Sequence, residues 1–145
     1  MQTIHATAIC SNGAGVLIRG PSGSGKSDLA LRCLGLSTGA LLPFPFELVS
    51  DDRVVVEREG DAVILSAPPT IAGLLEVRGL GVVPIGPVGA RAALKLVVNL
   101  VQSHEIERMP ETTMVEIAGL DFPALALSPF ESSAPLKLAL ALSKC

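Results

Sequence analysis

The chain has 145 residues, of which 49% are hydrophobic, and its mean hydropathy is +0.55; this composition excludes a disordered protein and predicts one globular domain spanning residues 1–145. The formal net charge is −3 and no basic stripe is visible, which argues against nucleic acid as a partner. No apolar stretch reaches the roughly 20 residues that a membrane span needs and no signal peptide is recognisable, so we expect a cytoplasmic protein with no membrane partner.

Strand-like segments dominate the chain. An Asn12-Gly13 turn predicts that the first two are antiparallel neighbours. The expected strands are 4–9, 15–19, 46–49, 54–56, 62–65, 92–101, 115–117 and 122–127. Helical spacing is confined to 26–36 and 134–142, and 74–83 contains too many glycines for a simple element. This order lacks regular β-α alternation and therefore predicts an α/β fold with a mixed, largely antiparallel sheet.

A glycine-rich segment joins the second expected strand to the first expected helix. It matches the pattern G-x-x-x-x-G-K-[ST], in which backbone N–H groups, a lysine and a hydroxyl surround the phosphates and Mg²⁺ of a nucleotide. The residues expected to bind ATP are Gly20, Pro21, Ser22, Gly23, Ser24, Gly25, Lys26 and Ser27. A plain glycine turn is the alternative, and the lysine, the serine and the strand–helix context together argue against it.

Two carboxylates, Asp51 and Asp52, follow the third expected strand. Beside a phosphate loop, a carboxylate at a strand end can hold Mg²⁺ or accept the proton of an attacking hydroxyl. Aspartate is also common in turns, so a capping role is the alternative. Glu76 and Arg78 lie among apolar residues, where charges need a partner or a ligand; they could equally pair with each other or lie on an exposed strand edge.

Cysteine, histidine and aromatic residues are few. Cys10, Cys33 and Cys145 have no C-x-x-C spacing and predict reduced thiols. The two histidines, His5 and His104, have no partner at metal-ligand spacing, which argues against a structural zinc site. Four Phe and no Trp or Tyr argue against base stacking on aromatic rings as the main binding mode.

Three motifs together resemble the catalytic domain of HPr kinase/phosphorylase, in the short form that lacks an N-terminal domain. They are Gly-Pro-Ser-Gly-Ser-Gly-Lys-Ser at 20–27, Val-Ser-Asp-Asp-Arg-Val at 49–54, and Leu-Leu-Glu-Val-Arg-Gly-Leu-Gly at 74–81. The resemblance implies a fold similar to the nucleotide-binding part of phosphoenolpyruvate carboxykinase. It also implies an ATP- and Mg²⁺-dependent protein serine kinase that phosphorylates the phosphocarrier HPr, regulates the phosphotransferase system, and in many members removes the phosphate by phosphorolysis.

The same resemblance implies roles for individual residues. Asp51 would be the base toward the HPr serine, and Lys26 would neutralise the transferred phosphoryl group. Ser27 and Glu76 would bind Mg²⁺. His5 falls where the family has an active-site histidine, and Arg108 matches a catalytic arginine; without the family, Arg108 reads as a solvated surface residue. A homo-oligomer is expected, since the family forms hexamers.

The chain departs from the family pattern near its end. The stretch 128–134 lacks the arginine that the family carries before its last helix, and 84–91 is abbreviated. A non-catalytic ATP-binding sensor is therefore the alternative to a kinase acting on HPr. A small-molecule kinase is a third hypothesis, against which the absence of an obvious lid domain argues.

Overall fold

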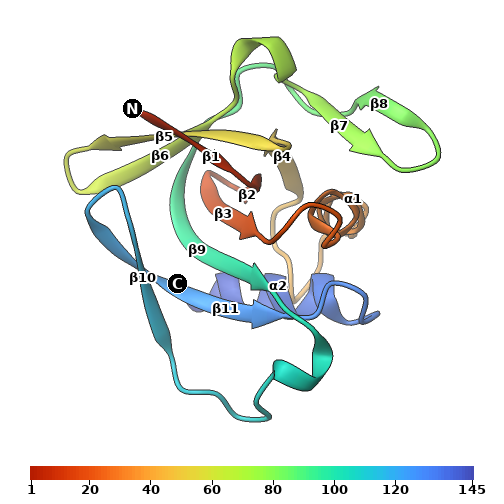
Figure 1. The fold of residues 1–145 in the computed structure, drawn as a ribbon, viewed down its shortest axis with the longest axis vertical. Helices are drawn as coiled ribbons and strands as arrows, with labels where there is room; N and C mark the ends of the chain where they lie inside the picture. Colours follow the sequence, from red (N-terminus) through yellow and green to blue (C-terminus); the bar gives the residue numbers. More distant parts are fainter.

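A curled sheet of nine strands forms the body of the protein in the computed structural model, which describes residues 1–145 (Figure 1). Its strands are β1 (Gln2–His5), β2 (Thr7–Ser11), β3 (Ala14–Arg19), β4 (Phe46–Ser50), β5 (Arg53–Glu59), β6 (Ala62–Ser66), β9 (Ala92–Leu100), β10 (Thr113–Ile117) and β11 (Leu120–Leu127). The remaining elements are a hairpin of β7 (Leu74–Val77) and β8 (Gly81–Pro84), helices α1 (Lys26–Leu34) and α2 (Ala134–Ser143), and 3₁₀ turns η1 (Pro69–Ile71) and η2 (Ser103–Glu105).

The sheet is mixed, as the strand-rich sequence predicts. Its strand order is β1-β5-β6-β9-β3-β2-β4, with β11 added alongside β9 and β10 alongside β11. Only β3–β9 and β9–β11 are parallel pairs. The first residues of β9 pair with β6 and its last residues pair with β11, so one long strand holds two neighbours on one edge. The sheet curls at this point, as Figure 1 shows.

Two apolar clusters lie on opposite faces of the sheet. Ile9, Val16 and Ile18 face the helices and pack with the buried side of α1 and α2. Their sequence neighbours Ala8 and Leu17 belong to the other cluster, inside the curl. This alternation follows from the two-residue period of a strand. It fixes α1 against the sheet, and with it the glycine-rich loop that precedes α1.

Three expected elements differ from the structure. The first expected strand is broken at Ala6, whose N–H donates to the Asp52 carbonyl, because β1 pairs with β5 whereas β2 pairs with β4. Helix α1 ends at Leu34, where Gly35 follows as its C-cap. The 74–83 segment is a regular hairpin, since Gly79 adopts a positive φ of 91° in its turn.

No helix in the structure combines the length and the apolar character that crossing a bilayer would need. Figure 1 shows the β7–β8 hairpin extending away from the sheet beside α1. This arrangement leaves a hollow between the start of α1, the end of β4 and the hairpin.

Candidate active site

A cavity of about 690 Å³ occupies this hollow. Its walls come from six parts of the chain: the end of β1, the start of β2, the glycine-rich loop with the first turns of α1, the residues after β4, strand β7 with the residue after it, and the loop before α2. Among the residues singled out in the sequence, those that line it are His5, Ser22, Gly23, Gly25, Lys26, Ser27, Asp51, Asp52, Glu76 and Arg78. Gly20, Pro21 and Ser24 of the glycine-rich loop do not line it. The fold thus gathers the three motifs of the sequence around one cavity.

The glycine-rich loop presents free backbone donors to the cavity. Gly25, at a positive φ of 99°, is the N-cap of α1. The N–H groups of Gly25, Lys26 and Ser27 donate no hydrogen bond within the chain. The side-chain oxygen of Ser24 is buried and also lacks a partner. Unpaired donors at a helix N-terminus favour an anion.

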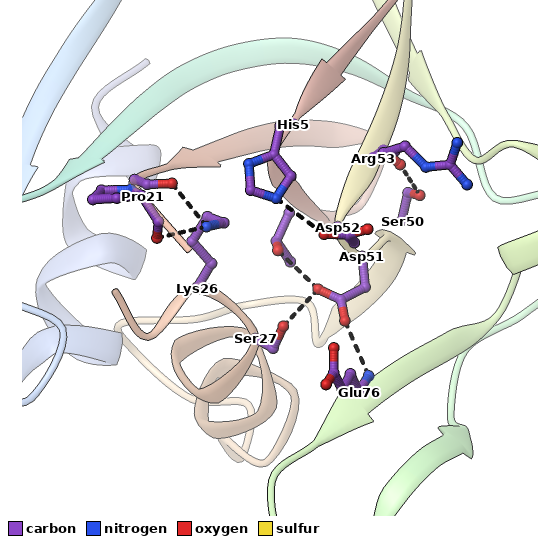
Figure 2. Close-up of polar contacts among 11 residues, drawn as sticks. His5, Pro21, Lys26, Ser27, Ser50, Asp51, Asp52, Arg53 and Glu76 are labelled. Carbon is purple, nitrogen blue, oxygen red and sulfur yellow. Dashed lines mark hydrogen bonds and ion pairs between the residues drawn. The ribbon is translucent and has the colours of Figure 1, made fainter. Parts of the chain in front are cut away.

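Lys26 is held inside the loop. Its side chain is buried, and its Nζ donates to the carbonyl oxygens of Gly20 at 2.8 Å and Pro21 at 3.0 Å (Figure 2). Because an ammonium group binds carbonyl oxygens more weakly than it binds a phosphate dianion, a bound nucleotide can draw Nζ away from them. The loop carbonyls keep the charge in place until then.

Asp51 connects the parts of the site. It is 5% exposed, and its Oδ1 accepts hydrogen bonds from the hydroxyls of Thr7 at 2.9 Å and Ser27 at 2.7 Å. Its Oδ2 accepts the backbone N–H of Glu76 at 3.0 Å. Figure 2 shows this carboxylate between α1 and β7. Asp51 therefore ties the glycine-rich loop, the sheet and the hairpin to one another.

Asp52 points elsewhere. It has a positive φ of 68°, and its Oδ1 lies 3.0 Å from His5 Nε2. Both side chains are exposed, the carboxylate at 64% and the imidazole at 49%. The β1–β5 register pairs His5 with Arg53 and so brings the histidine beside Asp52. The sequence left the role of Asp52 open; the structure places it on the cavity wall with a histidine partner.

Glu76 and Arg78 both line the cavity and are exposed, and they do not pair with each other. Arg108 is exposed on the segment between η2 and β10 and is not among the lining residues, and His104 lies in η2. Burial raises the pKa of the Cys33 thiol to about 12, so Cys33 is no nucleophile at neutral pH.

Sequence reasoning singled out none of the five remaining lining residues, which are Thr7, Asp28, Leu31, Val77 and Phe130. Thr7 was read only as part of a strand, although its hydroxyl binds Asp51. Phe130 belongs to the stretch noted for its missing arginine, yet it lines the cavity with 73% of its surface exposed. A large exposed aromatic residue next to a motif was the signal available for Phe130, and nothing in the sequence singled out Thr7.

The donor set fits a nucleotide with Mg²⁺. The free N–H groups of Gly25, Lys26 and Ser27, which all line the cavity, suit phosphate oxygens. The Ser27 hydroxyl and the Glu76 carboxylate are hard oxygen donors, which Mg²⁺ prefers, and both line the cavity. The site therefore has the chemistry to hold both groups together.

Comparison with known proteins identifies a family for this chain. The sequence model of the family "HPr Serine kinase C-terminal domain" matches residues 1–133. HPr kinase/phosphorylase of Burkholderia lata is 39% identical over 128 residues, and HPr kinase/phosphorylase 1 of Oceanobacillus iheyensis is 37% identical over 125. Each alignment covers 81% of this chain but only 37% and 36% of the respective relative, so the chain spans little more than a third of their length.

A solved structure supports the fold. The Hpr(Ser) kinase/phosphatase from Coxiella burnetii superimposes with a TM-score of 0.78 at 22% sequence identity, covering 99% of this chain and 89% of that one. The mixed, largely antiparallel sheet predicted from the strand order is therefore confirmed, and the structure shows that it is curled. With a family model matched over most of its length, the chain belongs to the HPr serine kinase C-terminal domain family.

Proposed function

We propose that this chain is an ATP- and Mg²⁺-dependent protein serine kinase that phosphorylates the phosphocarrier HPr and thereby regulates the phosphotransferase system. The observation that best supports this proposal is the position of the Asp51 carboxylate. It accepts hydrogen bonds from the Ser27 hydroxyl of the glycine-rich loop and from the Glu76 N–H of the hairpin, within one cavity. Because the relatives are HPr kinase/phosphorylases, we include HPr as the phosphate acceptor and the reverse phosphorolysis in the proposal.

Binding of the nucleotide rests on the glycine-rich loop. The free N–H groups of Gly25, Lys26 and Ser27 would hold phosphate oxygens, and the Lys26 ammonium would add charge at the transferred phosphoryl group. Ser27 and Glu76 would hold Mg²⁺, which when bound supplies further charge neutralisation. Positioning and charge neutralisation account for most of the rate in phosphoryl transfer.

The proton acceptor is the one role in which the geometry favours a different residue from the sequence. Asp51, expected as the base, is buried and already accepts three hydrogen bonds. Asp52 is exposed on the cavity wall, and its histidine partner can orient it. We therefore assign proton acceptance to Asp52 with His5, and the positioning of Ser27 and the hairpin to Asp51.

The transfer step then balances. The Asp52 carboxylate accepts the proton of the acceptor serine hydroxyl. For this transfer the two groups must lie within hydrogen-bond distance of each other. The hydroxyl oxygen forms a bond to the γ-phosphorus while the bond to the β–γ bridging oxygen breaks, and ADP leaves. In phosphorolysis, inorganic phosphate attacks phosphoserine, Asp52 returns the proton to the serine oxygen, and pyrophosphate forms.

The decisive experiment measures labelled phosphate transfer from ATP to the HPr of the same cell. We expect Asp52→Asn to lower the transfer rate by roughly 10²- to 10⁴-fold while ADP binding is retained. Asp51→Asn should weaken nucleotide binding as well, because Ser27 and the hairpin lose their shared acceptor. Loss of transfer in Asp51→Asn alone, with ADP binding intact, would return the base role to Asp51.

Phosphorolysis is tested by adding inorganic phosphate to phosphorylated HPr and measuring pyrophosphate. Arg108 has an exposed position away from the cavity, so its proposed catalytic role requires movement or a neighbouring copy. Comparison of Arg108→Ala with Arg91→Ala, which removes a surface ion pair to Glu59, tests that role. Light scattering tests the proposed homo-oligomer.

A sensor that binds ATP without transferring its phosphoryl group is the second candidate function. The observation that favours it is the 128–134 stretch, which carries no arginine beside the cavity. Tight ATP binding by the wild-type protein with no transfer to HPr would select this candidate.

A further inference from the structure

Phe130 is the one phenylalanine that lines the cavity, and 73% of its surface is exposed. It lies in the loop between β11 and α2. An exposed aromatic ring at the wall of a polar cavity is informative, because aromatic rings contribute binding energy when a ligand covers them.

The ring is set against the glycine-rich loop. A Cβ atom placed on Gly25 would lie 3.2 Å from both Cε1 and Cζ of Phe130, and 3.3 Å from the Cβ of Pro129. The edge of the ring therefore packs on the backbone that opens α1, while most of the ring stays open to the cavity. A larger residue at position 25 would push the ring away.

The loop that carries Phe130 is held in place by hydrogen bonds from α1. The Arg32 guanidinium on α1 donates to the carbonyl oxygens of Pro129 and, at 3.3 Å, Glu131, on either side of Phe130. Its Nε also donates to Asp28 at 3.0 Å, and Lys137 pairs with the Glu131 carboxylate. Because both flanking residues are held, the ring is positioned before any ligand arrives.

The cavity has two chemically different parts. The transferable end of a nucleotide must face the carboxylates Asp51, Asp52 and Glu76, where the proposed chemistry takes place. The nucleoside end then leaves the phosphate cradle past the first turns of α1, where Asp28, Leu31 and Phe130 line the cavity. The ring thus lies where a base would emerge.

We propose that Phe130 is the platform on which the base of the bound nucleotide stacks, an inference that rests on the proposed nucleotide binding of this site. The scarcity of aromatic residues in the sequence does not oppose this, since a single ring adds to a phosphate cradle that binds on its own. Every base has a π-face, so stacking alone tolerates different bases. The site should therefore take ADP and GDP with similar affinity.

Ligands with and without a base separate the platform from the cradle. The dissociation constants of ADP and of inorganic tripolyphosphate, both with Mg²⁺, are measured by calorimetry for the wild type, Phe130→Ala and Phe44→Ala. We expect Phe130→Ala to weaken ADP on the order of tenfold and to leave tripolyphosphate unchanged. Phe44 is also about half exposed but lies outside this cavity, so Phe44→Ala should change neither constant.

A tryptophan at this position gives a second readout. The chain contains no Trp and no Tyr, so Phe130→Trp introduces a single reporter. Its fluorescence should be quenched by ADP and GDP but not by tripolyphosphate, and its ADP affinity should match or exceed that of the wild type, which also shows that the variant folds.

Four results would overturn the inference in recognisably different ways. Unchanged ADP affinity in Phe130→Ala excludes the platform while leaving nucleotide binding intact. Equal weakening of ADP and tripolyphosphate assigns the ring a structural role under the loop. Unchanged ADP affinity with a raised KM for HPr makes the ring a contact for the acceptor protein. Failure of the wild type to bind either ligand removes the proposed function itself.

Discussion

The two walls of the cavity are built in opposite ways. On the sheet side, Thr7, Lys26 and Asp51 are at most 7% exposed, and each makes at least one hydrogen bond. On the hairpin side, the lining residues Glu76 and Arg78 are exposed. Beyond the cavity, Leu80 and Val82 of the same hairpin are 78% and 64% exposed. One wall is part of the core, and the other is an appendage with little surface to bury.

The hairpin has few attachments to the rest of the molecule. Leu75 is fully buried in the helix-side cluster, and the Glu76 N–H binds Asp51. The N–H groups of Ile85 and Gly86 donate to the Gly73 carbonyl and close the base of the hairpin on itself. The proposed Mg²⁺ ligand Glu76 therefore depends on the buried Leu75, the partly buried Val77 and one backbone hydrogen bond, whereas the glycine-rich loop lies between β3 and α1, which both pack in the core.

Removing the apolar attachment should have the largest effect. Leu75→Ala deletes a fully buried side chain from the helix-side cluster, and we expect it to lower the free energy of unfolding by about 3 kcal/mol. Urea denaturation measures the loss. Val82→Ala, on the exposed strand of the same hairpin, serves as the control and should change stability by no more than about 0.5 kcal/mol.

Amide exchange at Glu76 sharpens this comparison. If the hairpin is an appendage, its amides should exchange through local opening in Leu75→Ala while β3 and β9 remain protected. A loss below about 1 kcal/mol with a protected Glu76 amide would mean that other contacts hold the hairpin.

On the sheet side, the sensitive contact is polar. Thr7→Val keeps the shape of a buried side chain but removes the hydroxyl that donates to Asp51, and we expect a loss of about 2 kcal/mol because the acceptor is a carboxylate. Thr113→Val is the matched control, since the Thr113 hydroxyl donates to the Ala124 carbonyl at an exposed position. Equal losses in the two variants would show that Asp51 does not depend on Thr7.

Local patterns predicted the helices and strands well, because each element has its own residue periodicity or is bounded by turn residues. The expected strands 4–9 and 15–19, the Asn12-Gly13 turn between them and the apolar run at 92–101 correspond to antiparallel β2 and β3 and to β9. Pairings between distant segments were beyond the same reasoning. No residue near Ala6 indicates that β1 pairs with β5 while β2 pairs with β4. Strand pairing depends on segments that are distant in the sequence, so a local pattern does not predict it.

The candidate site shows the same contrast between local motifs, which the sequence reveals, and tertiary contacts, which it does not. The glycine-rich loop and the Asp51-Asp52 pair are contiguous motifs, so the sequence identified them as candidates. Their relation to one another is tertiary: the β1–β5 register gives Asp52 its histidine, and the burial of Asp51 depends on Thr7 and β7. The sequence therefore identified the carboxylate pair but could not say that Asp51 is buried and hydrogen-bonded while Asp52 is exposed on the cavity wall.

The smallest expected effect concerns the contact between the loop and the Phe130 ring. Gly25 and Gly23 have φ values of 99° and 78°, where an alanine is strained by about 1 kcal/mol. A Cβ at Gly23 meets nothing within 4 Å, whereas one at Gly25 meets the ring at 3.2 Å. Gly25→Ala should therefore destabilise slightly more than Gly23→Ala in urea denaturation.

The double variant isolates the ring's share of that difference. Adding Phe130→Ala should lower the cost of Gly25→Ala, with a coupling of about 0.5 kcal/mol, while the cost of Gly23→Ala should not change. The contact of the new Cβ with the Cβ of Pro129, at 3.3 Å, remains in the double variant. Coupling of equal size at both glycines would mean that the ring stabilises the loop as a whole. Coupling at Gly25 alone would mean that the Phe130 ring packs on the backbone at the N-terminus of α1. Glycine would then be needed at position 25 both for its positive φ and for its close contact with the ring.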